Sequence, residues 1–422
     1  MNGFARRLPR LAAAGIAAVL GSTALGGMAH AQVAPPFATL LRESENSPRS
    51  TAIAADVARA EGLAEQARSR PNPSVSVLAE NVAGGAPYRG FDGAETTLQL
   101  NQPFEFGGKR SARIAAGQAG VGVARARAFE ARVVYAHDLA LAYATAEVAQ
   151  RRVELAEDEV EEAEADLKVA RALVDAGKEA RLRSLQAESA LNALRADLDL
   201  AKANLVAALA RLSALAGAPN AYTGITGSVL ALSDTAATAG PVDPSRAAVY
   251  RTALAERDAA SQRLAYERKR AIPDVTGSLG VRRLERDNAT AMVVGVSVPL
   301  PLFDRNRGNI AAANAEVQGT AARAEAARIE AEAELRGAIA QADAAEARVK
   351  AAQASLDTAE EAYRLARIAY ESGKAPLIEL LAARHNLGAA RGVVVDTTAA
   401  RFAAYATLAR LQGRTITGDP IQ

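Results

Sequence analysis

The sequence predicts a mixed α and β fold made of two similar halves. A shift of 196 residues places Pro103 on Pro299 and Gly177-Lys178 on Gly373-Lys374 without a gap. Each half contains a helix, two short alternating segments and a very long tract with helical periodicity. These three observations predict two copies of one plan, in which two strands are followed by a long helical hairpin.

The composition favours closely packed helices over a bulky globular core. Half of the residues are apolar, yet aromatic residues make up 4% and there is no Trp, so much of the apolar content is Ala. The 50 basic residues nearly balance the 48 acidic ones, which argues against a nucleic-acid partner. Because the chain has no Cys, we expect no disulfide, no thiolate metal site and no lipid anchor on an N-terminal Cys.

The N-terminus has the pattern of a secretory signal peptide over residues 1–31. Three Arg residues precede a short apolar stretch, and Ala29-His30-Ala31 supplies the small residues of a cleavage site. We therefore expect cleavage after Ala31, with an uncleaved membrane anchor as the alternative. No later window of about 18 apolar residues predicts a transmembrane helix.

The two halves divide into matching segments around a linker. Helices end where Pro enters the chain, and Gly, Thr, Ser and Pro are frequent between the halves. The predicted first repeat is 32–217, with a helix at 48–69, strands near 73–82 and 94–105, and a helical hairpin at 107–216. The linker is 218–243. The second repeat is 244–413, with a helix at 245–270, strands near 273–283 and 290–302, and a hairpin at 304–412, and the tail is 414–422.

The alternating segments are near the length of a tilted strand that crosses a membrane. Four strands cannot close a barrel, and open strand edges are not tolerated in lipid. If the strands span a membrane, several chains must therefore share one barrel. A pair of ordinary surface hairpins is the alternative.

The long tracts carry a sustained heptad whose seam is rich in small residues. In the first half the seam runs from Tyr135 to Val174, and in the second from Leu335 to Tyr370. A continuous helix from 107 to 175 would be roughly 100 Å long. Gly177 and Gly373 suit left-handed turns, so each tract is predicted to fold back as a hairpin.

An acidic run at 157–166 lies within the first heptad tract. Its simplest interpretation is a solvated helix face, and the alternative is a lining that attracts cations to a channel. Neither Gly107-Gly108-Lys109 nor Gly177-Lys178 has the spacing of a phosphate-binding loop.

These motifs resemble the TolC family of outer-membrane channel proteins over essentially the whole mature sequence. The segment 298–308 (VPLPLFDRNRG) looks like the family's strand-to-helix junction in the second repeat. Within the family, the CzcC-like branch that serves heavy-metal efflux is the most similar. That branch is indicated by 71–73 (PNP), 95–98 (ETTL) and 102–110 (QPFEFGGKR).

The resemblance implies a homotrimer with a twelve-strand outer-membrane barrel, four strands from each chain, continued by a helical coiled-coil barrel in the periplasm. It implies a passive duct in a tripartite efflux system, in contact with outer-membrane lipid, a periplasmic membrane-fusion adaptor and an inner-membrane RND-type pump. We expect no enzyme activity and no cofactor, and heavy-metal cations as cargo. A multidrug or type I protein-secretion duct is the first alternative. A soluble periplasmic coiled-coil scaffold or adaptor is the second.

The resemblance also implies two sets of site residues. The helix-hairpin tips, Gly177, Lys178, Gly373 and Lys374, are expected to dock the adaptor. A periplasmic gate is expected near Arg183, Tyr370 and Glu379. Arg183 stands in the first repeat where an acid would be expected, and a contact between Arg183 and Glu379 on neighbouring helices would replace that acid. No metal site is expected, because the three His residues lie far apart.

Overall fold

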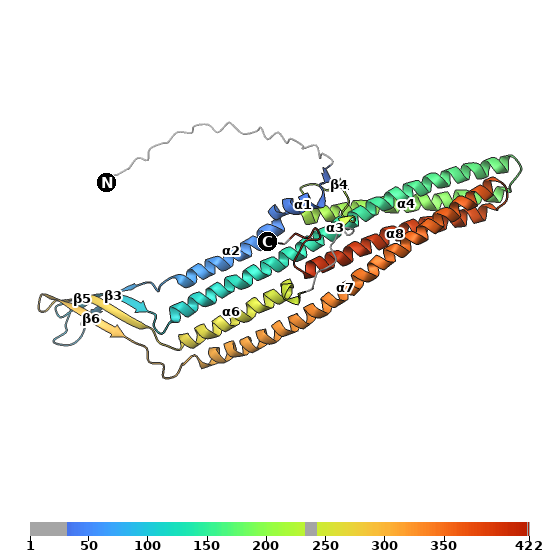
Figure 1. The fold of residues 1–422 in the computed structure, drawn as a ribbon. Helices are drawn as coiled ribbons and strands as arrows, with labels where there is room; N and C mark the ends of the chain where they lie inside the picture. Colours follow the sequence, from blue (N-terminus) through green and yellow to red (C-terminus); the bar gives the residue numbers. More distant parts are fainter. Residues whose placement is uncertain (1–31, 233–242, 420, 422) are drawn as a thin grey trace, which may run out of the picture.

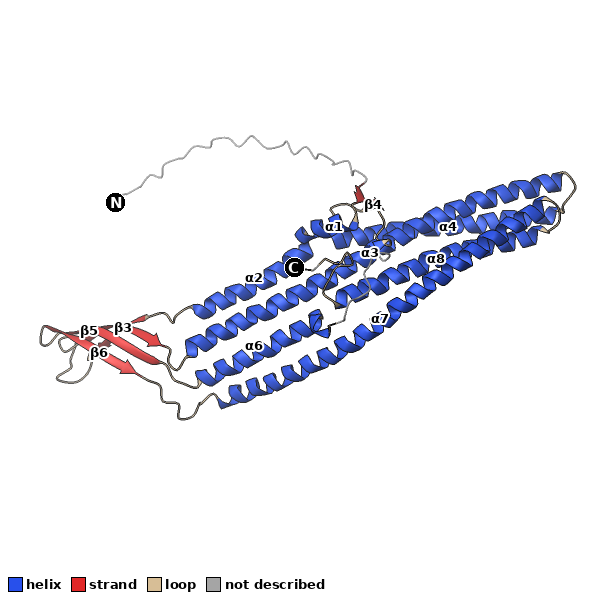
Figure 2. Ribbon diagram, viewed as in Figure 1, coloured by secondary structure: helices blue, strands red, loops and turns tan. Residues whose placement is uncertain are grey.

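The computed structural model describes residues 32–232, 243–419 and 421. The predicted signal peptide with its cleavage site, and part of the predicted linker, lie outside the described residues. The described chain is elongated, with a β-sheet at one end and the turns of helical hairpins at the other (Figures 1 and 2).

The long elements follow one another in the same order in both halves of the chain. The first half contains α2 (Pro48–Arg68), β2 (Ser74–Glu80), β3 (Glu95–Phe104), α3 (Lys109–Asp175) and α4 (Arg181–Ala216). The second half contains α6 (Ala248–Arg270), β5 (Val275–Leu284), β6 (Ala289–Ser297), α7 (Arg307–Glu371) and α8 (Leu377–Leu411). Shorter elements are β1 (Gln32–Ala34), α1 (Phe37–Glu43), η1 (Ser44–Asn46), β4 (Tyr222–Ile225) and η2 (Pro244–Arg246).

Local backbone chemistry sets the ends of the strands. The β6 strand ends at Ser297, before the expected boundary at 302, because Pro299 and Pro301 have no N–H to donate to a ladder. The β2 strand ends at Glu80 because Asn81 takes the left-handed conformation, with φ of 58°.

The four long strands form one antiparallel sheet in the order β2-β3-β5-β6. Its centre is the ladder between β3 and β5, which joins the two halves of the chain from Glu95 opposite Leu284 to Phe104 opposite Val275. β2 and β6 each pair on one side only, so the sheet has two unpaired edges within the described chain.

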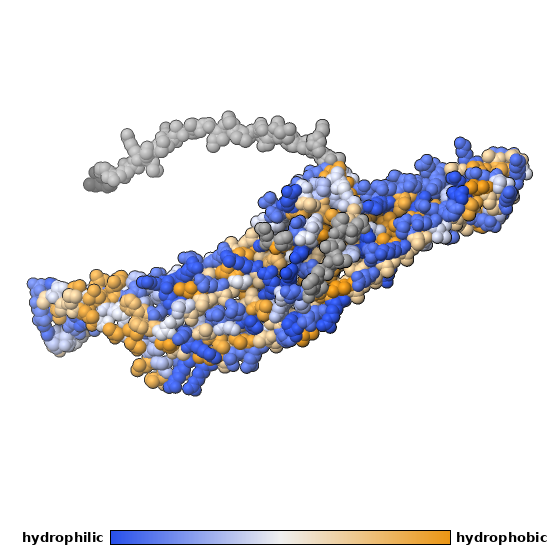
Figure 3. All heavy atoms as spheres, viewed as in Figure 1, coloured by the Kyte–Doolittle hydropathy of each residue, from blue (hydrophilic) through white to orange (hydrophobic). Residues whose placement is uncertain are grey.

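One face of this sheet is apolar and exposed. Directly opposite residues of an antiparallel sheet share a face, so the strand register defines two apolar rows across all four strands. The side chains in these rows are between 47% and 74% exposed. The rows are Val77–Leu98–Val281–Met292 and Val75–Leu100–Leu279–Val294. On the molecular face drawn in Figure 3, hydrophobic residues gather over the sheet.

The opposite face of the sheet is polar. The Arg282 guanidinium lies 3.0 Å from a Glu95 carboxylate oxygen and 3.3 Å from one of Glu80, and it donates a hydrogen bond to Thr97 at 3.0 Å. This arginine is therefore paired with one acid from β2 and one from β3, which leaves the group with one net negative charge. We call these four residues the Arg282 cluster.

The helical hairpins pack along the predicted heptad seam. α3 packs against α4 and α7 packs against α8, and the residues of the predicted seam are buried or partly buried. α2, α3, α6 and α7 lie side by side in that order and extend away from the sheet along the length of the molecule (Figure 1).

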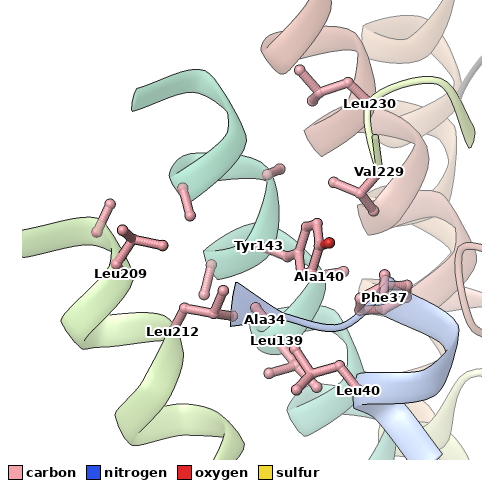
Figure 4. Close-up of a cluster of buried hydrophobic side chains, with 14 of the residues drawn as sticks. Ala34, Phe37, Leu40, Leu139, Ala140, Tyr143, Leu209, Leu212, Val229 and Leu230 are labelled. Carbon is pink, nitrogen blue, oxygen red and sulfur yellow. The ribbon is translucent and has the colours of Figure 1, made fainter. Parts of the chain in front are cut away.

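The main hydrophobic core lies at mid-length of the molecule, and it uses short segments that the heptad pattern did not predict. Phe37 and Leu40 of α1 pack on Leu139 and Tyr143 of α3 (Figure 4). The Phe37 and Tyr143 rings meet edge to face with centroids 6.0 Å apart. Part of the predicted linker also enters this core, through β4 and the buried side chains of Val229 and Leu230.

A buried glutamate explains why this part of the linker is ordered. Glu147 on α3 is 4% exposed and accepts hydrogen bonds from the backbone N–H groups of Val229 at 2.7 Å and Leu230 at 3.1 Å. It also accepts one from the Ser228 hydroxyl at 2.5 Å, and pairs with Arg151 at 2.8 Å. The carboxylate therefore satisfies backbone donors that would otherwise be buried without partners.

Replacing Glu147 with Ala should release the 226–232 segment from α3. Loss of these hydrogen bonds leaves buried donors unpaired, at a cost of about 1–3 kcal/mol. Limited proteolysis of the purified protein should then cut this segment faster than in the parent. Glu154→Ala, one heptad further along α3 at an exposed position, is the matched control and should leave the cleavage rate unchanged. Equal rates in the two variants would contradict the anchoring role.

Candidate functional site at the tips of the helical hairpins

The two hairpin turns have the same backbone geometry. In the first, Gly177 has φ of +68°, its N–H donates to the Val174 carbonyl at 2.9 Å, and the Lys178 N–H donates to that of Leu173 at 2.9 Å. This is the hydrogen-bond pattern of a Schellman motif, which ends a helix with a left-handed residue. The second turn repeats it with Gly373 donating to Tyr370 at 2.9 Å and Lys374 to Ala369 at 2.8 Å.

The tips require Gly for backbone conformation rather than for space. A Cβ added at Gly177 or Gly373 would meet no atom within 4 Å, but the positive φ is strained for any side chain. Lys178 and Lys374 are exposed at these turns. All four predicted tip residues are thus brought to one end of the molecule, where the two turns present small, solvent-facing surfaces (Figure 1).

An apolar cluster joins the two hairpins just behind the tips. It includes Leu167 and Ala170 of α3, with Tyr370, Leu377 and Leu380 of the second hairpin. Tyr370 is 5% exposed and its hydroxyl has no hydrogen-bond partner among the described residues. Burial raises the pKa of Tyr370, and the charges of Glu179 and Asp166 raise it further.

The three predicted gate residues have different surroundings. Tyr370 points into the apolar cluster, so its contacts here are those of a packing residue. Arg183 is half-buried near Glu179, at 3.8 Å, and donates to the Gln186 side chain at 3.2 Å. Glu379 is exposed in the first turn of α8. Among the ion pairs of the described residues, Arg183 is joined to Glu179 and not to Glu379.

Sequence reasoning missed a series of ion pairs between α3 and α8. Asp166 and Arg384 lie 2.7 Å apart with both side chains buried, Glu162 and Arg391 lie 3.4 Å apart, and Arg152 and Asp396 lie 2.5 Å apart. The sequence contained a signal for these pairs. Arg384 and Arg391 are one heptad apart on α8, and their partners Asp166 and Glu162 are four residues apart on α3, so each set lies on one face of its helix.

The acidic run is therefore a pairing surface rather than a purely solvated face. Its other members reach α4, where Glu157 pairs with Lys202 at 3.3 Å and Glu164 with Arg195 at 2.7 Å. Acids of the run thus bind bases on two different helices, which ties both hairpins together.

Burial raises the pKa of the Asp166 carboxyl above its usual value, and the Arg384 guanidinium partly offsets that rise. The pKa of Glu159, on the same helix, is also raised by burial. Both carboxyls lie far from the sheet, in the part of α3 that approaches the hairpin turn.

Within the described ranges, no group of three or more His, Asp or Glu side chains is placed to hold a metal ion. None of the helices there is long and apolar enough to cross a membrane.

The comparisons with known proteins agree with this architecture. The family model described as outer membrane efflux protein matches residues 42–218 and 249–414. The chain belongs to the outer membrane efflux protein family. This confirms the resemblance seen in the sequence, and since the family is one of outer membrane proteins, it decides against the soluble scaffold.

Three curated relatives match between about three quarters and nearly all of the chain. The nickel-cobalt-cadmium resistance protein NccC of Alcaligenes xylosoxydans xylosoxydans is 43% identical over 95% of this chain and 91% of its own length. The nickel and cobalt resistance protein CnrC of Cupriavidus metallidurans is 44% identical over 74% of this chain and 75% of its own. The cobalt-zinc-cadmium resistance protein CzcC of Cupriavidus metallidurans is 31% identical over 86% of this chain and 86% of its own length. Similarity to these proteins confirms the CzcC-like branch.

Two solved structures show the same fold at lower identity. The outer membrane protein VceC of Vibrio cholerae has a TM-score of 0.73 and 22% identity, covering 91% of this chain and 96% of its own. A structure of CusC has a TM-score of 0.77 and 17% identity, covering 90% and 92%.

Replacing Asp166 with Asn should loosen the contact between α3 and α8 behind the tips. Loss of a charged hydrogen bond costs about 2 kcal/mol, which corresponds to about 30-fold faster local amide exchange. Hydrogen exchange over residues 377–391 measures this, and Asp158→Asn at an exposed position of α3 is the control.

The same variant should alter the pH dependence of this region. The pKa of the Asp166 carboxyl is higher in the folded chain than in the unfolded chain, where it is near 3.8. Between these two pKa values the folded chain holds a proton on Asp166 that the unfolded chain has lost. The free energy of unfolding therefore falls as pH rises from 3.8 through the folded pKa. Asp166→Asn removes that contribution. An unchanged exchange profile at every pH would show that the pair is unimportant.

Proposed function

We propose that this outer-membrane efflux channel works as a passive homotrimeric duct that carries heavy-metal cations out of the cell. The trimer is supported by the sheet, which has an exposed apolar face, a polar opposite face and two unpaired edges within the described chain. Such a sheet is stable in lipid only if its edge groups are hydrogen-bonded by further strands.

Three copies would satisfy this requirement. β2 of one chain would pair with β6 of the next, giving twelve strands with four from each chain, an even number as such barrels have. The apolar rows would face outer-membrane lipid, and the Arg282 cluster would face the lumen. The row of helices that extends from the sheet, α2, α3, α6 and α7, would continue the barrel wall as a periplasmic tunnel.

The duct itself would supply no energy. An inner-membrane RND-type pump would drive export, coupled through a periplasmic membrane-fusion adaptor. The tips at Gly177, Lys178, Gly373 and Lys374 are exposed at the end of the molecule far from the sheet, as an adaptor-docking surface requires. The signal peptide would direct export and be removed by cleavage after Ala31, so that the mature chain begins at Gln32.

The metal cargo is supported by the relatives, since two of them, at 43% and 44% identity, are resistance proteins for nickel and cobalt, with cadmium in one case. A third, CzcC, is a resistance protein for cobalt, zinc and cadmium.

Deletion of the gene should make cells sensitive to nickel, cobalt, zinc or cadmium salts, because the pump would have no exit path. Growth across metal and antibiotic panels measures this. The intact gene should restore growth, whereas a Gly177→Val/Gly373→Val double variant should fail, since a β-branched residue is strained at positive φ. Gly177→Asn/Gly373→Asn, which tolerates that conformation, is the matched control. Sensitivity to antibiotics alone would refute the metal cargo.

A second prediction concerns the gate. We propose that Arg183 and Glu379 meet between adjacent chains and narrow the periplasmic mouth, with Tyr370 packing behind them. Arg183→Ala or Glu379→Ala should then raise single-channel conductance in planar bilayers. The charge-swapped double variant Arg183→Glu/Glu379→Arg should restore the parent value. Unchanged conductance in both single variants would rule out this contact as a gate.

A further inference from the structure

Basic residues are concentrated where the sheet meets the helices. We define the junction collar as residues 65–74, 104–113, 267–275 and 298–307, the four places where a strand joins a helix. These segments contain ten basic and five acidic residues. The opposite end of the sheet, residues 80–95 and 282–288, contains four basic and five acidic ones. The excess is therefore local, in a chain whose total charge is nearly balanced.

Four of the five acids of the collar form ion pairs with four of its ten basic residues. Glu65 pairs with Arg68 at 3.0 Å, Glu105 with Arg113 at 2.6 Å, Glu267 with Arg270 at 3.0 Å and Asp274 with Lys109 at 2.7 Å. The fifth, Asp304, accepts a hydrogen bond from the Asn306 N–H at 2.8 Å.

Six exposed cations of the collar make no ion pair with a carboxylate among the described residues. Arg110 donates to the Arg68 carbonyl at 2.7 Å and Arg305 to that of Pro301 at 3.2 Å, so their charges remain uncompensated. The six are Arg70, Arg110, Arg268, Lys269, Arg305 and Arg307.

Helix stability explains only part of this charge. Arg268 and Lys269 lie in the last turn of α6, where the helix dipole favours cations. Arg110 and Arg307 lie in the first turns of α3 and α7, where the dipole disfavours them, and neither turn contains an acid. An anion outside the chain would remove this unfavourable arrangement.

Exposed apolar side chains adjoin these cations. Phe303 is 100% exposed, Leu300 is 74% exposed, and Phe106 is 50% exposed. Apolar and aromatic residues beside basic ones, at the boundary of an apolar strand face, are typical of a membrane–water interface. In Figure 3, hydrophilic residues over the helix ends lie beside the hydrophobic surface of the sheet.

We propose that the junction collar binds the anionic headgroups of phospholipids in the periplasmic leaflet. The exposed apolar side chains would enter the leaflet, and the six uncompensated cations would hold the phosphate groups at its surface. This inference rests on the proposed membrane position of the sheet. The collar would thereby fix the depth of the barrel in the membrane.

The absence of Trp allows a direct test. Phe303→Trp places one fluorophore per chain at the collar, and Val294→Trp places one on the apolar sheet face. Each full-length mature protein is reconstituted in phosphatidylcholine vesicles containing brominated phosphatidylglycerol or brominated phosphatidylcholine, and quenching is compared.

For Phe303→Trp, brominated phosphatidylglycerol should quench about threefold more strongly than brominated phosphatidylcholine. The preference should fall in Lys269→Gln/Arg307→Gln, which removes two of the six cations, and should also weaken at about 0.5 M salt. It should persist in Arg89→Gln/Arg286→Gln, which removes the same charge from the opposite end of the sheet.

Equal quenching of Phe303→Trp by the two lipids would overturn the proposal that the collar binds anionic headgroups. Quenching of Val294→Trp without quenching of Phe303→Trp would also overturn it, by placing the collar against the duct or a protein while leaving the barrel intact. Absence of quenching at both positions would refute the membrane position of the sheet, and with it the proposed function.

Discussion

The ladder between β3 and β5 determines the arrangement of the rest of the molecule. It pairs ten residues of one half with ten of the other, and thereby sets the strand order β2-β3-β5-β6. Each strand joins its helix through a short junction, so the helices must follow in the corresponding order α2, α3, α6 and α7. The long coiled hairpins then continue a row of helices whose order was imposed by backbone hydrogen bonds in the sheet.

The parts of the fold that depend on local periodicity were accessible from the sequence. The heptad seam from Tyr135 to Val174 is buried as the pattern requires, because steps of three and four residues keep one stripe on one side of a helix. Gly177 and Gly373 end their helices because a left-handed residue is needed there. The strands were expected within a few residues, and their ends shifted at Pro299 and Asn81 for reasons of backbone chemistry.

The parts that depend on distant contacts were not accessible. The segment around Val229 has the composition of a linker, and nothing local shows that Glu147, far away in the sequence, will order it. The pair between Asp166 and Arg384 joins residues 218 positions apart. Tyr370 belonged to two predictions, the heptad seam and the gate, and in this chain its contacts are those of the seam, because an apolar pocket between hairpins accommodates an aromatic ring.

The Arg282 cluster has a consequence for the electrical behaviour of the proposed pore. One positive charge lies at contact distance from two negative ones, so the cluster keeps one net negative charge in each chain. Three copies around the proposed lumen would form an acidic ring at one level of the wall. Such a ring enriches cations over anions near the wall at low ionic strength, and salt screens the enrichment once the Debye length becomes shorter than the pore radius.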